Sequence, residues 1–104
     1  MVNPQFFQIR VSDLRYRRVK HGIDPSQANI QAGRSTEELL RYDPDDPIRG
    51  EPYYTGDEDP SGPARGLQVM GGHHRLHELY TRYRRGEVDG AIQVDVQYEP
   101  WEYQ

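Results

Sequence analysis

One segment constrains the fold more than any other, because a short apolar run ends in two glycines and a helical pattern follows at once. The run from Gly66 to Met70 has the length of a strand and is bounded by glycines. Beyond Gly72 a single apolar stripe has helical spacing, at Leu76, Leu79, Tyr80 and Tyr83. Gly86 is expected to end this helix, and a second strand then alternates polar residues with Ile92, Val94 and Val96. The sequence therefore predicts a unit of strand, turn, helix and strand.

Two further elements are expected before this unit. A half-buried first strand is predicted by the alternation of polar residues with Phe7, Ile9 and Val11. Residues 35 to 38 form a capping box, in which the Ser35 hydroxyl and the Glu38 carboxylate each bind an amide of the other residue. A short helix should therefore begin there and run through Tyr42, because the residue before Pro44 disfavours helical geometry.

The remaining segments are predicted to be less regular. Residues 16 to 33 show no period and contain several turn formers, so we expect irregular backbone there. Residues 43 to 65 hold five of the eight prolines and form a loop rich in proline and acids. Within it, residues 48 to 54 are expected to supply an edge strand, where a proline is tolerated. The aromatic tail, about residues 98 to 104, either packs on the body or binds a partner.

Length and composition bound the architecture. A chain of 104 residues has the size of one small domain, and 34% hydrophobic residues allow only a thin core. We therefore predict a single α+β domain over residues 1 to 104, with a short mixed sheet.

Composition also excludes several kinds of site. The chain has no cysteine, which excludes disulfides, thiolate metal sites and cysteine nucleophiles. No apolar run approaches the roughly 18 residues of a membrane span, so we expect a soluble protein without a membrane partner. The net charge of −4 argues against coating nucleic acid by bulk electrostatics. The charge is uneven, however, since residues 1 to 20 are basic and residues 43 to 59 carry seven acids against one arginine.

The turn from Gly71 to Arg75 is the candidate functional site. A strand that leads through glycines into a helix presents backbone amides and the positive end of the helix dipole to an anion. Gly71 and Gly72 lack a Cβ, so a phosphate can approach the main chain closely, and Arg75 adds a bidentate charged group. His73 and His74 can donate or accept a proton near neutral pH. These residues are the parts of a phosphoester site.

Two kinds of chemistry are open to this turn. In the first, one of His73 and His74 acts as general base or acid and Glu78 orients it. In the second, His73 and His77 bind a divalent metal such as Mg²⁺ or Zn²⁺, since they are four residues apart and share a helix face. Glu78 or a distant acid would then be the third ligand. Peptidase chemistry is not expected, because the glutamate that the metalloprotease motif places second is missing.

The order of the elements and the sequence of the turn resemble the superfamily of ParB-like nucleases and sulfiredoxins, over roughly residues 6 to 98. The sulfiredoxin motif reads Gly-Gly-Cys-His-Arg, so four residues match and His73 replaces the catalytic cysteine. The nucleotide-binding motif of chromosome-partitioning relatives reads Gly-Glu-Arg-Arg, of which only Gly72 and Arg75 match. The resemblance implies a ParB/sulfiredoxin-like fold, but neither sulfinic acid reduction nor cytidine triphosphate switching.

Stand-alone domains of this size with a Gly-His-His-Arg turn look like the C-terminal effector domains of secreted bacterial polymorphic toxins, which act as DNases. The resemblance thus implies a secreted protein that acts in the cytoplasm of a target cell, with a cognate immunity protein as partner. If the first strand lies beside the motif strand, phosphates that flank the scissile one would be held by Arg10, Arg15, Arg17 and Arg18. The acidic segment would then lie away from the substrate.

Three functions follow as hypotheses. The leading one is a phosphodiesterase, specifically a nuclease, with the turn binding phosphate. The second is a small enzyme that hydrolyses or transfers phosphate from ATP or another nucleoside triphosphate, a compact ligand that suits a net charge of −4. The third is a non-catalytic module that uses the same turn to hold a phosphorylated partner. The residues alone leave DNA, RNA and free nucleotide open as ligands.

Overall fold

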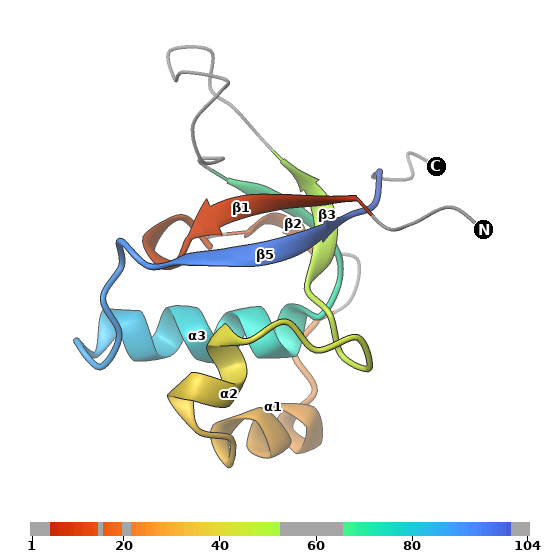
Figure 1. Ribbon diagram of the computed structural model, residues 1–104. Helices are drawn as coiled ribbons and strands as arrows, with labels where there is room; N and C mark the ends of the chain where they lie inside the picture. The colour runs from red at the N-terminus through yellow and green to blue at the C-terminus, as the bar shows by residue number, and fades with distance from the viewer. Residues whose placement is uncertain (1–4, 15, 20–21, 53–65, 101–104) are drawn as a thin grey trace.

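In the part of the chain that the structure describes, five strands form one mixed sheet, and three α-helices lie on one side of it (Figure 1). The computed structural model describes residues 5–14, 16–19, 22–52 and 66–100, with the backbone alone for residues 16–19. The strands are β1 (Phe6–Arg10), β2 (Tyr16–Val19), β3 (Arg49–Pro52), β4 (Leu67–Gly71) and β5 (Gln93–Tyr98). The helices are α1 (Pro25–Ala32), α2 (Thr36–Leu40) and α3 (His73–Arg84), with a 3₁₀ turn η1 (Val11–Asp13) after β1.

The order of strands in the sheet is β1-β5-β3-β4-β2, so β1 and β2 are its edges. β1 pairs antiparallel with β5, with Ile9 opposite Val94. β3 is antiparallel to β4 and parallel to β5, and β2 runs parallel to β4. The strand that leads into the turn, β4, therefore has β3 on one side and β2 on the other.

The core lies between the sheet and α3. Alternate residues of β1, β4 and β5 are buried, as the period of two requires, and they include Ile9, Leu67, Val69, Val94 and Val96. From the helix, Leu76 and Leu79 are fully buried against them. α1 and α2 lie farther from the sheet and pack on α3 (Figure 1). The sheet, α3 and the two short helices thus form successive layers.

The predicted unit of strand, turn, helix and strand is confirmed. β4 ends at Gly71, and α3 begins two residues later at His73. Gly86 ends the helix in the left-handed conformation, with φ of 77°, while the amides of Gly86 and Glu87 each donate to a carbonyl of the last turn at 2.9 Å. One detail differs from the prediction. Ile92, which was expected in the last strand, lies just before β5 and is 39% exposed.

The predicted capping box is present in modified form. The Ser35 hydroxyl accepts from the Glu38 amide at 3.1 Å, as expected. The Glu38 carboxylate binds the Ser35 hydroxyl at 3.1 Å, where the sequence pattern predicts the Ser35 amide. α2 ends at Leu40, so Tyr42 lies beyond the helix.

Two expectations for irregular or peripheral segments are wrong. Residues 16 to 33 contain β2 and α1, the latter capped by Asp24 and starting at Pro25. The pair Asp24-Pro25, which was expected to form a turn, starts a helix. α1 has no buried apolar stripe, since Ile30 is 52% exposed. β3 is a central strand, not an edge, and it ends at Pro52, where the amide donor is missing.

Some predictions fall outside the described residues. They concern residues 53 to 65 of the predicted loop of residues 43 to 65, and the aromatic tail from Trp101 onward. The start of the tail is described, and there the Glu99 amide donates to the carbonyl of Gly50 in β3 at 2.9 Å. In the parts of the chain that are described, no helix is long and apolar enough to cross a membrane.

We expect Gly72→Ala to destabilise the fold more than Gly86→Ala does. Both glycines have positive φ, 72° and 77°, so each substitution introduces left-handed strain of about 1–2 kcal/mol. A Cβ at residue 72 would in addition lie 2.3 Å from the carbonyl oxygen of Pro47, whereas no atom of the described residues lies within 4 Å of a Cβ at residue 86. Urea unfolding of both variants should show a further loss of at least about 1 kcal/mol at residue 72. Equal losses would contradict the close contact with Pro47.

Candidate functional site

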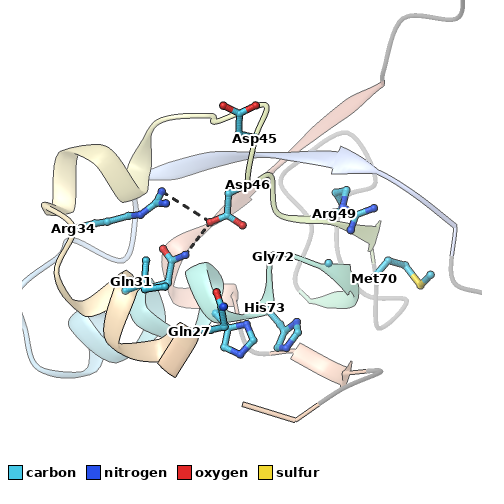
Figure 2. A pocket seen from close by; sticks show the side chains of 12 residues that line it. Gln27, Gln31, Arg34, Asp45, Asp46, Arg49, Met70, Gly72 and His73 are labelled. Atoms are coloured by element: carbon cyan, nitrogen blue, oxygen red, sulfur yellow. Dashed lines mark hydrogen bonds and ion pairs between the residues drawn. The ribbon is translucent and has the colours of Figure 1, made fainter. Parts of the chain in front are cut away.

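A pocket of about 590 Å³ opens at the N-terminus of α3. Its walls come from α1, from the segment between α2 and β3, and from the end of β4 with the first turn of α3 (Figure 2). Residues Gly71 to His74 of the predicted turn line it, together with Arg34, Asp45, Asp46 and Arg49. The turn that the sequence singles out therefore lies at a cavity.

None of the described side chains caps the helix terminus at this pocket. Gly72 occupies the cap position in the left-handed conformation, and the first intrahelical bond is donated by the Leu76 amide to the Gly72 carbonyl at 3.0 Å. The amides of the three preceding residues are those that a helix leaves without an intrahelical acceptor. The positive end of the α3 dipole therefore faces the pocket, as an anion site requires.

Both histidines of the turn line the pocket and are anchored to the chain just before α1. Nε2 of His73 lies 3.1 Å from the carbonyl oxygen of Gly22. Nε2 of His74 accepts a hydrogen bond from the backbone amide of Asp24 at 2.9 Å. The two rings are in contact, with centroids 4.1 Å apart and planes inclined by 38°. The structure thus brings together two imidazoles that the sequence could only place next to each other along the chain.

The anchoring segment is itself held by a helix cap. The Asp24 carboxylate accepts from the hydroxyl and the amide of Ser26, at 2.8 and 2.9 Å. These hydrogen bonds lower the pKa of Asp24, and the nearby His74 contributes to the same shift. The carboxylate therefore remains ionised at neutral pH and keeps the start of α1 beside the two histidines.

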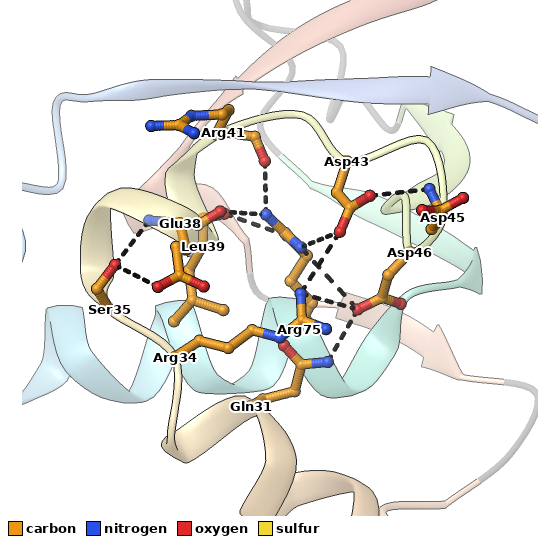
Figure 3. Close-up of polar contacts among 10 residues, drawn as sticks. All are labelled: Gln31, Arg34, Ser35, Glu38, Leu39, Arg41, Asp43, Asp45, Asp46 and Arg75. Carbon is orange, nitrogen blue, oxygen red and sulfur yellow. Dashed lines mark hydrogen bonds and ion pairs between the residues drawn. The ribbon is translucent and has the colours of Figure 1, made fainter.

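Arg75 does not face the pocket, although the sequence pattern assigns it to phosphate. Its side chain is 3% exposed and turns inward beneath the segment that follows α2 (Figure 3). The guanidinium donates to the backbone carbonyls of Glu38, Leu39 and Arg41. Its Nη1 has no hydrogen-bond partner among the described residues and lies 3.8 Å from Asp43 and 4.0 Å from Asp46.

This environment makes Arg75 a structural group. Burial lowers the pKa of Arg75, and the carboxylates of Asp46 and Asp43 partly offset that effect. The three carbonyls belong to the end of α2, where a helix leaves acceptors without intrahelical donors. Arg75 therefore joins α2 and the following segment to the first turn of α3.

The pocket contains paired charges of both signs. Arg49 forms an ion pair with Glu99 at 2.8 Å, and its guanidinium lies so close to Gly71 that a Cβ there would be 2.2 Å from Nη2. Arg34 lies 3.5 Å from Asp43 and 3.9 Å from Asp46. The Asp46 carboxylate also accepts from Nε2 of the buried Gln31 at 2.8 Å (Figure 2). The expectation that the acidic segment lies away from this site is therefore wrong, because Asp45 and Asp46 form part of its wall.

The other predicted catalytic and metal-binding residues of α3 lie outside the pocket. Glu78 forms an ion pair with Arg82 at 3.6 Å, with both side chains mostly buried. Arg82 in turn donates to Thr36 and to the carbonyls of Ala32 and Arg34, and so ties α3 to the junction of α1 and α2. His77 is half-buried and does not line the pocket. Glu78 is thus part of a helix-packing network.

No metal cluster of the expected kind is assembled. Among the described residues no group of three or more histidine, cysteine or acidic side chains could hold a metal ion. His73 and His77 have no third ligand of these types from this part of the chain. Asp45 and Asp46 are the acidic residues that line the pocket, and the Asp46 carboxylate already binds Gln31 and Arg34.

The predicted nucleic-acid arginines are separated by the sheet order. Arg10 lies on β1, which β5 and β3 separate from β4, and its side chain pairs with Asp13 at 3.0 Å. The first strand is therefore not beside the motif strand. Arg17 and Arg18 lie on β2, which does pair with β4, although only their backbone is described. Arg15 lies outside the described residues.

Several pocket residues were not predicted from the sequence. Gln31, Arg34 and Arg49 come from segments whose expected structure was irregular or peripheral, and no spacing in the chain connects them to residues 71 to 75. Comparisons of the chain with protein-family models, curated proteins and solved structures found no match. The class that the fold and the pocket define is a small α+β domain with a paired-histidine site at a helix N-terminus.

We expect Arg75→Met to destabilise the protein by about 3–5 kcal/mol, because it leaves buried carbonyls and carboxylates without their cation. Arg85→Met is the matched control, since the Arg85 side chain is 67% exposed and its ion pair with Glu87 spans 4.0 Å. This control should change stability by less than about 0.5 kcal/mol. Urea unfolding measures both values. A small loss of stability in Arg75→Met would contradict the structural role and would favour the phosphate-binding role that the sequence predicts for Arg75.

Proposed function

We propose that this chain hydrolyses phosphodiester bonds and is a nuclease domain of the ParB-like type. The observation that carries the proposal is the pair of contacting imidazoles, 4.1 Å apart, at the uncapped N-terminus of α3 inside a pocket. Histidine is the side chain best suited to move protons at neutral pH, and a helix N-terminus favours a phosphate. The resemblance of the turn to Gly-His-His-Arg effector domains agrees with this chemistry.

In this proposal the phosphate binds at the first turn of α3. The backbone amides of that turn and the guanidinium of Arg49 at the same wall stabilise the negative charge that develops on the phosphoryl oxygens. The histidines carry out proton transfer and charge stabilisation. Arg75 keeps this arrangement in place through its contacts with the end of α2. A polymorphic toxin with a cognate immunity protein is the biological setting that the resemblance suggests.

A divalent cation would enter the same pocket together with the phosphate. Asp45 and Asp46 lie in the pocket wall, where Asp46 already accepts from Gln31 and lies 3.9 Å from Arg34. Mg²⁺ would neutralise the repulsion between these carboxylates and the phosphate, and it is commonly held by one or two carboxylates plus substrate. The proposal therefore includes dependence on Mg²⁺.

The size of the pocket favours a second candidate function. A volume of about 590 Å³ lies within the range of small-molecule sites, roughly 300–1,000 Å³. A single nucleotide would fit in the pocket between α1 and α3, whereas a long polyanion would be repelled by a chain of net charge −4. Hydrolysis of a free nucleoside triphosphate is therefore the alternative reaction of the same residues.

We expect the purified protein to cleave plasmid DNA in Mg²⁺ and not in EDTA. His73→Gln should reduce the rate about 10²–10⁴-fold, the usual contribution of a general base. His77→Gln, a histidine of the same helix outside the pocket, should cleave at the rate of the unaltered chain, and both variants should melt at its temperature. Absence of cleavage of plasmid DNA, single-stranded DNA and RNA with Mg²⁺, Mn²⁺ or Zn²⁺ would overturn the nuclease proposal.

Nucleotide binding separates the alternatives. If the second candidate is correct, a nucleoside triphosphate at millimolar concentration should raise the melting temperature by mass action and release inorganic phosphate. Binding without phosphate release, together with no cleavage of nucleic acid, would indicate the non-catalytic module. If the chain is a nuclease, we expect no triphosphate hydrolysis, and the triphosphate should raise the melting temperature no more than inorganic phosphate does.

A further inference from the structure

One guanidinium of the pocket wall has contacts that fix both its position and the direction of its plane. Arg49 lines the pocket from β3 (Figure 2), and its Nη1 donates to Oε2 of Glu99 at 2.8 Å. A Cβ at Gly71 would lie 2.2 Å from Nη2 of Arg49 and 2.7 Å from both Cζ and Nε. Because these three atoms of the plane are about equally close, the flat face of the guanidinium lies over the glycine.

The position of Arg49 over Gly71 comes from an irregularity in the sheet. Gly50 is opposite Val69, whereas Arg49 is opposite Gly71. β4 therefore has one extra residue, Met70, between the two pairs. In a regular antiparallel pair Arg49 would be opposite Met70. A bulge of this kind redirects a side chain, and here it brings Arg49 to the end of β4, where the turn begins.

We infer that the edge of Arg49 formed by Nε and Nη2 binds two oxygens of the substrate phosphate, and that Gly71 and Glu99 are the positioning residues for it. Among the described residues these two nitrogens have no hydrogen-bond partner, since the contact with Glu99 is made by Nη1. The inference rests on the proposed function and deepens it, because the bidentate contact that the sequence pattern gives to Arg75 passes to a residue of β3.

The geometry of this edge defines the class of ligand. The N–H groups of Nε and Nη2 lie side by side in one plane, so they match an oxyanion that has two free oxygens on one atom. The two non-bridging oxygens of a phosphodiester meet this requirement. A carboxylate has the same pair of oxygens with less charge than inorganic phosphate, and the two anions are therefore compared below.

The other arginines near the pocket are less suited to this contact. The guanidinium of Arg75 donates to backbone carbonyls at the end of α2. Arg34 lies within 4.0 Å of two carboxylates, those of Asp43 and Asp46. Arg49 pairs with one carboxylate and keeps a whole edge of its fork for a ligand.

Glu99 is itself fixed to the strand that carries Arg49. Its amide donates to the carbonyl of Gly50 at 2.9 Å, directly after β5 ends at Tyr98. The carboxylate therefore binds Nη1 from a defined place, while Gly71 lies beneath the plane. These two contacts orient the fork before a ligand arrives, which lowers the entropic cost of binding.

The direct test follows the Nε–H signal of Arg49 in proton–nitrogen spectra of the full chain at slightly acidic pH, with Arg49→Lys to assign it. Inorganic phosphate should shift this signal until the site is saturated. Acetate at the same ionic strength should shift it less. No response of the Arg49 signal to phosphate, or a larger response to acetate, would overturn the inference.

Substitution at residue 49 separates the fork from its charge. Arg49→Lys keeps a cation but has no second nitrogen in the plane. It should weaken the binding of inorganic phosphate about tenfold, as expected for the loss of one charge-assisted hydrogen bond. Arg85→Lys, at an arginine that is 67% exposed and outside the pocket lining, should bind phosphate as the unaltered chain does. Calorimetric titration measures these affinities, and an unchanged affinity in Arg49→Lys would contradict the bidentate contact.

A double-mutant cycle tests the positioning by Gly71. This glycine does not have a positive φ, so Gly71→Ala adds no left-handed strain, and its Cβ meets the far end of a flexible side chain. The variant should fold, displace the guanidinium and weaken phosphate binding. In an Arg49→Ala background the guanidinium is already absent, so Gly71→Ala should cause no further loss. Additive losses would mean that the Cβ blocks the ligand directly, and would overturn the positioning role.

Two substitutions at residue 99 test the other contact. Both remove the negative charge, but Glu99→Gln keeps an acceptor for Nη1 of Arg49 and Glu99→Ala does not. If Glu99 positions the fork, Glu99→Ala should bind phosphate more weakly than Glu99→Gln. If the carboxylate only neutralises Arg49, both variants should bind phosphate more tightly than the unaltered chain, and by the same factor. That second result would overturn the role of Glu99.

Phosphate binding and cleavage fail separately. The binding measurements involve no turnover, so a chain that binds phosphate at Arg49 and cleaves no phosphoester would overturn the hydrolase and leave this contact in place. Cleavage by an Arg49→Lys variant with the kcat and KM of the unaltered chain would do the reverse.

Discussion

The buried guanidinium of Arg75 is the interaction on which the pocket depends. α2 has only five residues, so its terminal carbonyls have few intrahelical donors. Arg75 donates to three of these carbonyls and lies within 4.0 Å of the carboxylates of Asp43 and Asp46 (Figure 3). A single side chain from the first turn of α3 thereby binds the end of α2 and lies beside the acidic residues that follow it.

The two glycines of the turn serve packing as well as ligand access. Gly72 has a positive φ and lies against the backbone of Pro47 and Ile48, while Gly71 leaves space for the guanidinium of Arg49. The residues that suggest a phosphate cradle are therefore needed first to bring β3, β4 and α3 close together. What remains for chemistry is the set that faces the cavity, namely the two imidazoles, the open helix terminus and the arginines and carboxylates around it.

The elements that were predicted correctly are those in which local residues decide the structure. The apolar stripe of α3, the alternation in β5 and the capping box at Ser35 each reflect contacts within a few residues of the chain. α1 was missed because it is held by polar contacts, such as the Gln31 amide on Asp46 and the Arg82 guanidinium on the Ala32 carbonyl. The central position of β3 was missed because its neighbours, β4 and β5, are remote in sequence.

The sequence by itself determined that residues 71 to 75 form a turn between a strand and a helix, since glycine geometry and helical period are local properties. The position of that turn relative to the rest of the chain was decided only by tertiary structure. Side-chain direction on the helix sends Arg75 inward to the α2 carbonyls and leaves His73 and His74 at the pocket. Asp45 and Asp46 reach the same pocket, and the backbone of residues 22 to 24 reaches the two histidines, through contacts between distant segments that no pattern along the chain encodes.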